Sequence, residues 1–155
     1  MNVVTKIVVT ESCIALFKCY TPLMQKRNPV VHFEMPYNDA ARLSKFYSEV
    51  FGWGMNNLGA QMNEYVTAST AETDENRMVK TPGTINGGFF PQSSSPEAKT
   101  SVVISVDDIN EAIKKVTENG GKVVGQPVEI PGIGMYVGII DTEGNRLSIL
   151  QPKMK

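Results

Sequence analysis

The stretch VVHFEMPYNDAARLSKFYSEVFG, residues 30–52, decides how this chain is interpreted. It opens with a short apolar run that Pro36 closes, which is typical of a strand. Asp39 then offers a helix N-cap, apolar residues recur at spacings of three or four, and Gly52 follows the last of them. The stretch therefore predicts a strand followed by an amphipathic helix.

The same pattern occurs a second time, as TSVVISVDDINEAIKKVTENGG at residues 100–121. The interval from Asp39 to Gly52 equals the interval from Asp108 to Gly121, so the two copies are in step. The closing segments TINGGFFP, residues 84–91, and NRLSILQP, residues 145–152, also match. Fewer residues separate these two segments than separate the two strand–helix stretches. The chain is therefore predicted to be an internal repeat of helix-backed units.

Each half offers one helix and about four strands, which predicts an α+β fold of two tandem βαβββ modules, residues 30–91 and 100–152. A length of 155 residues with 41% hydrophobic residues fits one domain. We assign this domain to residues 29–155. Residues 1–28 differ in pattern and are interpreted as an N-terminal extension that packs on a partner subunit. A sheet with helices on one face leaves the other face for function.

Charge and composition exclude several classes of partner. Fifteen Lys and Arg against sixteen Asp and Glu give a net charge of -1 without blocks of like charge, so we expect neither nucleic acid nor a membrane surface as a partner. No apolar run is long enough to span a bilayer. The two cysteines, Cys13 and Cys19, have no metal or redox spacing. These features favour a cytoplasmic protein with reduced thiols.

Three motifs resemble the glyoxalase, bleomycin-resistance and extradiol-dioxygenase superfamily, also called the vicinal oxygen chelate superfamily. They are HFEMP at residues 32–36, FYSEVFGW at residues 46–53 and IDTEGN at residues 140–145. The nearest group is that of the lactoylglutathione-lyase-related proteins. The resemblance implies that the two modules form a curved mixed sheet shaped as a cup, and that the protein is a homodimer.

Enzymes of this superfamily place a divalent metal in the cup, with ligands from the first and last strand of each module. On this sequence the four ligand positions fall on His32, Gly87, Ser101 and Ser148. A divalent ion needs three or more His or carboxylate ligands, and only His32 qualifies. We therefore expect an incomplete metal site and no cofactor, with a divalent metal as the alternative.

His32 and Glu34 share a strand face because side chains alternate along a strand. The pair is suited to proton transfer, since a carboxylate tunes an imidazole. In a purely structural alternative, His32 bonds to backbone and Glu34 is partly solvated. The residues expected to line a ligand pocket are Phe89, Ser101, Val103, Tyr136, Arg146 and Ser148.

Two functions remain open from the sequence. The first is a metal-free protein that holds a small apolar or aromatic ligand in the cup. The second is a lyase or isomerase related to lactoylglutathione lyase, with His32 or Glu34 as catalytic base and possible use of a divalent metal.

Overall fold

The computed structural model describes residues 27–75, 78–94 and 99–153. The predicted extension, residues 1–28, lies almost entirely outside the described residues. The first strand begins at Val30, and the Pro29 carbonyl accepts a hydrogen bond from the backbone of Ser105.

The elements follow one another in the predicted order, strand, helix and three strands, twice. The first module contains β1 (Val30–Tyr37), α2 (Ala40–Phe51), β2 (Gly54–Asn57), the short 3-10 helix η1 (Ala60–Met62), β3 (Val66–Ser69) and β4 (Asn86–Pro91). After a second 3-10 helix, η2 (Gln92–Ser94), come β5 (Ser101–Ser105), α3 (Ile109–Glu118), β6 (Lys122–Ile130), β7 (Gly134–Ile140) and β8 (Arg146–Pro152). The predicted α+β fold of two βαβββ modules is confirmed.

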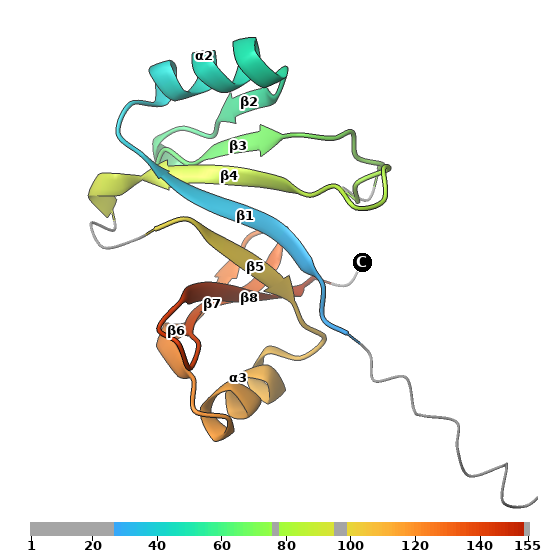
Figure 1. The fold of residues 1–155 in the computed structure, drawn as a ribbon, viewed down its shortest axis with the longest axis vertical. Coiled ribbons are helices and arrows are strands. Elements are labelled where there is room, and N and C mark those ends of the chain that lie inside the picture. The colour runs from blue at the N-terminus through green and yellow to red at the C-terminus, as the bar shows by residue number, and fades with distance from the viewer. Residues whose placement is uncertain (1–26, 76–77, 95–98, 154–155) are drawn as a thin grey trace, which may run out of the picture.

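The strands form one eight-stranded sheet in the order β2-β3-β4-β1-β5-β8-β7-β6 (Figure 1). In each module the first strand pairs in parallel with the last, β1 with β4 and β5 with β8. The modules join because β1 and β5 pair antiparallel at the centre of the sheet. The first strands of both modules therefore lie side by side, and residues of the two modules meet there.

Both helices begin and end as the sequence predicts. The Asp39 carboxylate accepts the backbone N–H of Arg42 at 2.9 Å, and Gly52 ends α2 in the left-handed conformation with a φ of 69°. Asp108 caps α3 in the same way. These caps fix where each helix leaves the sheet.

The two helices cover the same face of the sheet. In the first module, Tyr47 of α2 packs over Phe33 of β1 and the fully buried Phe89 of β4. In the second, α3 packs over a cluster that includes Val137 and Ile149. We call this the helix face. Because side chains alternate along strands, the even-numbered residues of β1, with His32 and Glu34 among them, point to the opposite face.

One difference from the sequence concerns Pro36, which was expected to close the first strand. The strand continues to Tyr37, and Pro36 pairs with Phe90 of β4. The pairing of β1 with β5 already ends at Glu34, opposite Ser101. Proline lacks an N–H donor and is tolerated in a strand where one side has no partner, as here.

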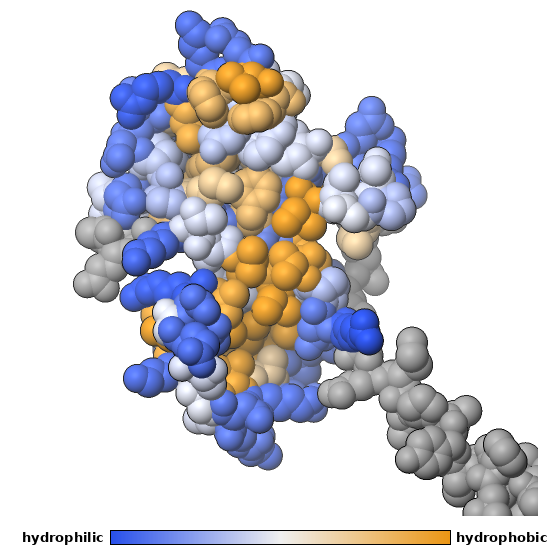
Figure 2. Space-filling view, in the orientation of Figure 1, coloured by the Kyte–Doolittle hydropathy of each residue, from blue (hydrophilic) through white to orange (hydrophobic). Residues whose placement is uncertain are grey.

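Hydrophobic atoms also gather over α2, at the top of the view in Figure 2. The exposed large apolar side chains of this helix are Phe46, Val50 and Phe51, which are 52%, 56% and 57% exposed. Among the described residues, no helix combines the length and the apolar character needed to cross a membrane.

Candidate functional site

The centre of the face opposite the helices carries two hydrogen-bonded groups of polar side chains. The first joins His32 of β1 to Tyr65, which directly precedes β3. The imidazole Nε2 and the phenol oxygen are 2.9 Å apart. Which of the two donates depends on the tautomer of His32. His32 is therefore held by another side chain, unlike in the structural alternative considered from the sequence.

The second group joins Glu34 of β1 to Tyr136 of β7 and Ser148 of β8. The Tyr136 hydroxyl donates to Glu34 Oε2 at 2.8 Å and lies 2.7 Å from the Ser148 hydroxyl oxygen. Ser148 is 5% exposed, and the other two side chains are half-buried. We refer to these three residues with His32 and Tyr65 as the polar cluster.

Tyr65 was not anticipated from the sequence, yet the repeat gives it a counterpart. Strand register pairs Thr67 with Gly88 in the first module and Gly138 with Ser148 in the second. Tyr65 lies two residues before Thr67, and Tyr136 lies two residues before Gly138. The two modules thus place a tyrosine at equivalent points, and both hydroxyls reach side chains of β1.

Gly88 provides the space that Tyr65 occupies. A Cβ atom on Gly88 would overlap the phenol oxygen and two ring carbons of Tyr65. Gly87, assigned from the sequence as the closing-strand position of the first module, instead lies against the Phe33 ring on the helix face. The register corrects that assignment by one residue, because Gly88 opposite Glu34 corresponds to Ser148 opposite Val103.

A tight loop delivers Tyr65 to the cluster. Asn63 and Glu64, the two residues before it, have left-handed φ angles of 52° and 56°, which costs energy for residues other than glycine. The Tyr37 hydroxyl donates to the Glu64 carbonyl at 2.6 Å, and the Tyr65 backbone N–H donates to the Met62 carbonyl at 3.0 Å. Strand β3 therefore begins only at Val66, because these residues turn first.

Burial controls the protonation of the cluster. It lowers the pKa of His32 below its ordinary value of 6.5. It raises the pKa of Glu34, and the hydrogen bond from Tyr136 offsets part of that rise. Burial and the Glu34 carboxylate both raise the pKa values of Tyr65 and Tyr136. Both phenols are therefore neutral hydrogen-bond donors near neutral pH.

The donor set does not fit a divalent metal ion. In the described part of the chain, no three His, Cys, Asp or Glu side chains gather where they could hold a metal. Of the positions that the resemblance singled out, Ser101 and Ser148 supply hydroxyls, and the glycine of β4 supplies no side chain. The Glu34 carboxylate is bonded to Tyr136. A tightly held ion needs three or more nitrogen or carboxylate ligands.

Three of the other predicted pocket residues lie on the same face as the polar cluster, and the fourth lies on the helix face. Val103, 2% exposed, pairs with His32 on one side and with Ser148 on the other, so it lies beneath the cluster. Ser101 is opposite Glu34. Arg146 shares the strand face of Ser148 and is exposed. Phe89 does not line this face: it is 1% exposed and packs 5.0 Å from the Tyr47 ring on the helix face, which corrects the expectation from the sequence.

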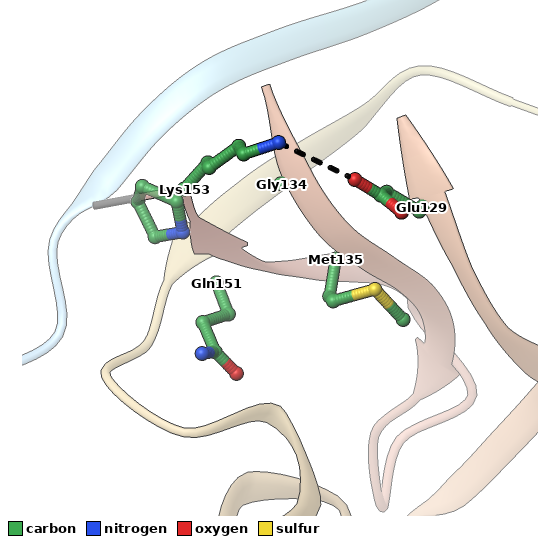
Figure 3. A pocket seen from close by; sticks show the side chains of 6 residues that line it. Glu129, Gly134, Met135, Gln151 and Lys153 are labelled. Carbon is green, nitrogen blue, oxygen red and sulfur yellow. Dashed lines mark ion pairs between the residues drawn. The ribbon is translucent and has the colours of Figure 1, made fainter. Parts of the chain in front are cut away.

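A pocket of about 290 Å³ lies away from the cluster, beside β6, β7 and the end of β8 (Figure 3). Its lining includes Glu129 and Lys153, which form an exposed ion pair at 3.8 Å. Gln151, also in the lining, accepts the backbone N–H of Ile109 at the start of α3. These polar side chains already have partners within the protein, so we do not assign the pocket a function.

Comparisons with known proteins agree with the observed fold. The family model described as Glyoxalase/Bleomycin resistance protein/Dioxygenase superfamily matches residues 30–149. A glyoxylase-like domain-containing protein of Didymella fabae is 32% identical over 120 residues, which are 75% of this chain and 88% of that protein.

Solved structures share the fold at low sequence identity. A hypothetical protein of Bacillus halodurans C-125 aligns with a TM-score of 0.60 and 17% identity, over 84% of this chain and 98% of that one. Streptomyces coelicolor methylmalonyl-CoA epimerase aligns with a TM-score of 0.58 and 11% identity, over 81% and 94%. Because the family model matches residues 30–149 and the Didymella fabae relative is 32% identical, the chain belongs to the glyoxalase, bleomycin-resistance and dioxygenase superfamily.

Proposed function

We propose that this protein binds a small organic molecule with an apolar or aromatic part on the sheet face that carries the polar cluster, and that it does so without a metal. The composition of the cluster is the observation that carries this proposal. It offers hydroxyl, imidazole and carboxylate groups at the centre of the sheet, but fewer ligands than a divalent ion requires.

Apolar side chains beside the cluster support an apolar part of the ligand. Val128 of β6 pairs with Tyr136, and Val124 pairs with Gly138, so both share the face of the cluster. They are 54% and 38% exposed. Exposed apolar side chains next to a few convergent polar groups are typical of a binding surface. A ligand that bonds to the cluster could cover these valines.

Thermal unfolding in the presence of added compounds tests the proposal. We expect aromatic or apolar small molecules to raise the Tm, because a ligand that binds only the folded state stabilises it. Low micromolar Ni(II), Zn(II) or Mn(II) is expected to leave the Tm unchanged. Stabilisation by a metal but by no organic compound would contradict the proposal.

A second candidate is proton abstraction next to a carbonyl group, as in a lyase or isomerase. The observation that favours it is the environment of Glu34, because burial raises its pKa and the side chain shares a strand face with His32. A base with a raised pKa is better matched to work near neutral pH. Glu34 would take the proton, and the C–H electrons would move into an enolate.

Deuterium exchange distinguishes catalysis from binding. Incubating acetophenone in D2O with the protein and following its methyl signal by NMR would reveal proton abstraction. Exchange above the buffer rate that is lost in Glu34→Gln would support the second candidate. Exchange at the buffer rate, together with saturable binding of the ketone, would support binding without catalysis.

A further inference from the structure

We propose that Tyr65 and Tyr136 form a paired hydroxyl site for the carbonyl oxygen of a neutral ligand. This inference rests on the proposed small-molecule function and names the ligand chemistry at the same site. In this site the two phenols, in place of a metal, supply the electrophilic contact to the oxygen.

The internal repeat is the first support. Tyr65 and Tyr136 occupy equivalent positions of their modules by strand register. Both hydroxyls converge on neighbouring residues of one strand, since Tyr65 bonds to His32 and Tyr136 bonds to Glu34. Tyr136 also contributes electrostatically to the raised pKa of Tyr65. The two hydroxyls thus lie on the same face of the sheet beside neighbouring positions of β1, where one ligand can contact both.

The construction around Tyr65 is the second and independent support. Two consecutive residues other than glycine, Asn63 and Glu64, adopt the left-handed conformation immediately before it. Such residues cost energy and cluster at functional sites. Gly88 lacks the Cβ that would displace the phenol. The turn and the space above Gly88 together hold the Tyr65 hydroxyl beside His32.

Each tyrosine oxygen also has a polar group that can support it while its proton turns to a ligand. The Ser148 hydroxyl can donate to the Tyr136 oxygen, at 2.7 Å. In one tautomer, His32 donates from Nε2 to the Tyr65 oxygen, at 2.9 Å. A hydroxyl that accepts a hydrogen bond is a stronger donor. Tyr136 has a single proton, which it donates to Glu34 in the ligand-free protein, so a hydrogen bond to a ligand replaces that bond. Both phenols can then donate to one carbonyl oxygen, which has two lone pairs.

Charge selects a neutral carbonyl over a carboxylate. The Glu34 carboxylate raises the pKa of both phenols by its negative charge, and the same charge would repel an anionic ligand. A neutral ketone or aldehyde oxygen avoids this repulsion and still accepts two hydrogen bonds. The ligand class we infer is a neutral carbonyl compound with an apolar or aromatic substituent.

Matched probes test the inference. Acetophenone and cyclohexyl methyl ketone are titrated by protein NMR beside ethylbenzene and ethylcyclohexane, which lack the carbonyl. We expect each ketone to bind more tightly than its hydrocarbon, and this preference to fall about fivefold in Tyr65→Phe and in Tyr136→Phe. Fivefold corresponds to one net hydrogen bond of ~1 kcal/mol. Tyr47→Phe, on the helix face, is the control and should keep the preference.

The outcomes separate this inference from the proposed function. Ketone and hydrocarbon binding equally well would overturn the inference and leave the binding function intact. A ketone preference that neither Tyr65→Phe nor Tyr136→Phe reduces would also overturn it. Failure of all four probes to bind would contradict the proposed function and the inference together.

Discussion

Replacing Gly88 by alanine tests whether the space above this glycine holds Tyr65 in the polar cluster. The backbone of Gly88 has no positive φ, so alanine fits its conformation. The new Cβ would overlap the Tyr65 phenol. Carbon and oxygen atoms in contact need roughly 3.5 Å, so the phenol must withdraw by about 1 Å or more. The 2.9 Å bond to His32 cannot survive that movement.

The energy follows from the lost bond. The loss of a hydrogen bond that leaves its partner buried and unpaired costs about 2 kcal/mol. Alanine in place of glycine restricts the unfolded chain and so stabilises the folded state by roughly 0.5 kcal/mol. The net loss of about 1.5 kcal/mol lowers the Tm by about 3–6 °C for a chain of this size. Gly138→Ala is the matched control, because its Cβ would make an ordinary 3.5 Å contact with Val124.

NMR titration of the imidazole provides the second readout, since His32 is the only histidine of the chain. Burial lowers the pKa of His32 in the native protein. When Tyr65 withdraws, water reaches the ring, and the pKa is expected to rise toward its ordinary value. A Gly88→Ala protein with the same Tm and the same His32 pKa as Gly138→Ala would refute the role assigned to this contact.

Three further predictions concern charge, metal and assembly. Burial raises the pKa of Glu34 in the folded protein above its value in the unfolded chain. The protonated side chain therefore contributes to stability fully at pH values below the unfolded-state pKa, and this contribution is lost as the pH rises through the folded-state pKa. Glu34→Gln should therefore raise the Tm at pH 8 and leave it nearly unchanged at pH 4, and an equal gain at both pH values would argue against a buried charge. Low micromolar Ni(II), Zn(II) or Mn(II) should not change the Tm, whereas a rise of several degrees would reveal a metal site. We propose a homodimer in which the apolar side chains of α2 are covered: light scattering should give twice 17.0 kDa, and Val50→Asp should shift the protein toward the monomer. A wild-type species of 17.0 kDa would contradict the dimer.

Local signals in the sequence were sufficient to predict most of the fold. Asp39, Gly52 and Asp108 act at short range, because a cap depends on backbone groups within one helical turn. The repeat then placed the second module by comparison with the first. The relation of His32 to Glu34 was predictable for a similar reason, since alternation along one strand depends on two adjacent positions.

The parts of the site that depend on pairing between strands could not be predicted. Gly87 and Gly88 are adjacent, and only the register of β4 against β1 shows which one faces the cluster. Tyr65 follows two residues whose left-handed backbone has no glycine to indicate it. One signal was nevertheless present. Aligning the third strands of the two modules, as the register does, would have matched Tyr65 with Tyr136.

The position of Trp53, the only tryptophan of the chain, decides what fluorescence can report. Its ring lies 4.8 Å from that of Tyr47 and 5.6 Å from that of Phe33, all within the first module. Tryptophan emission therefore reports on the first module and does not report loosening around α3. An unfolding curve recorded by emission and one recorded by circular dichroism will coincide only if the pairing of β1 with β5 makes both halves melt as a single cooperative unit.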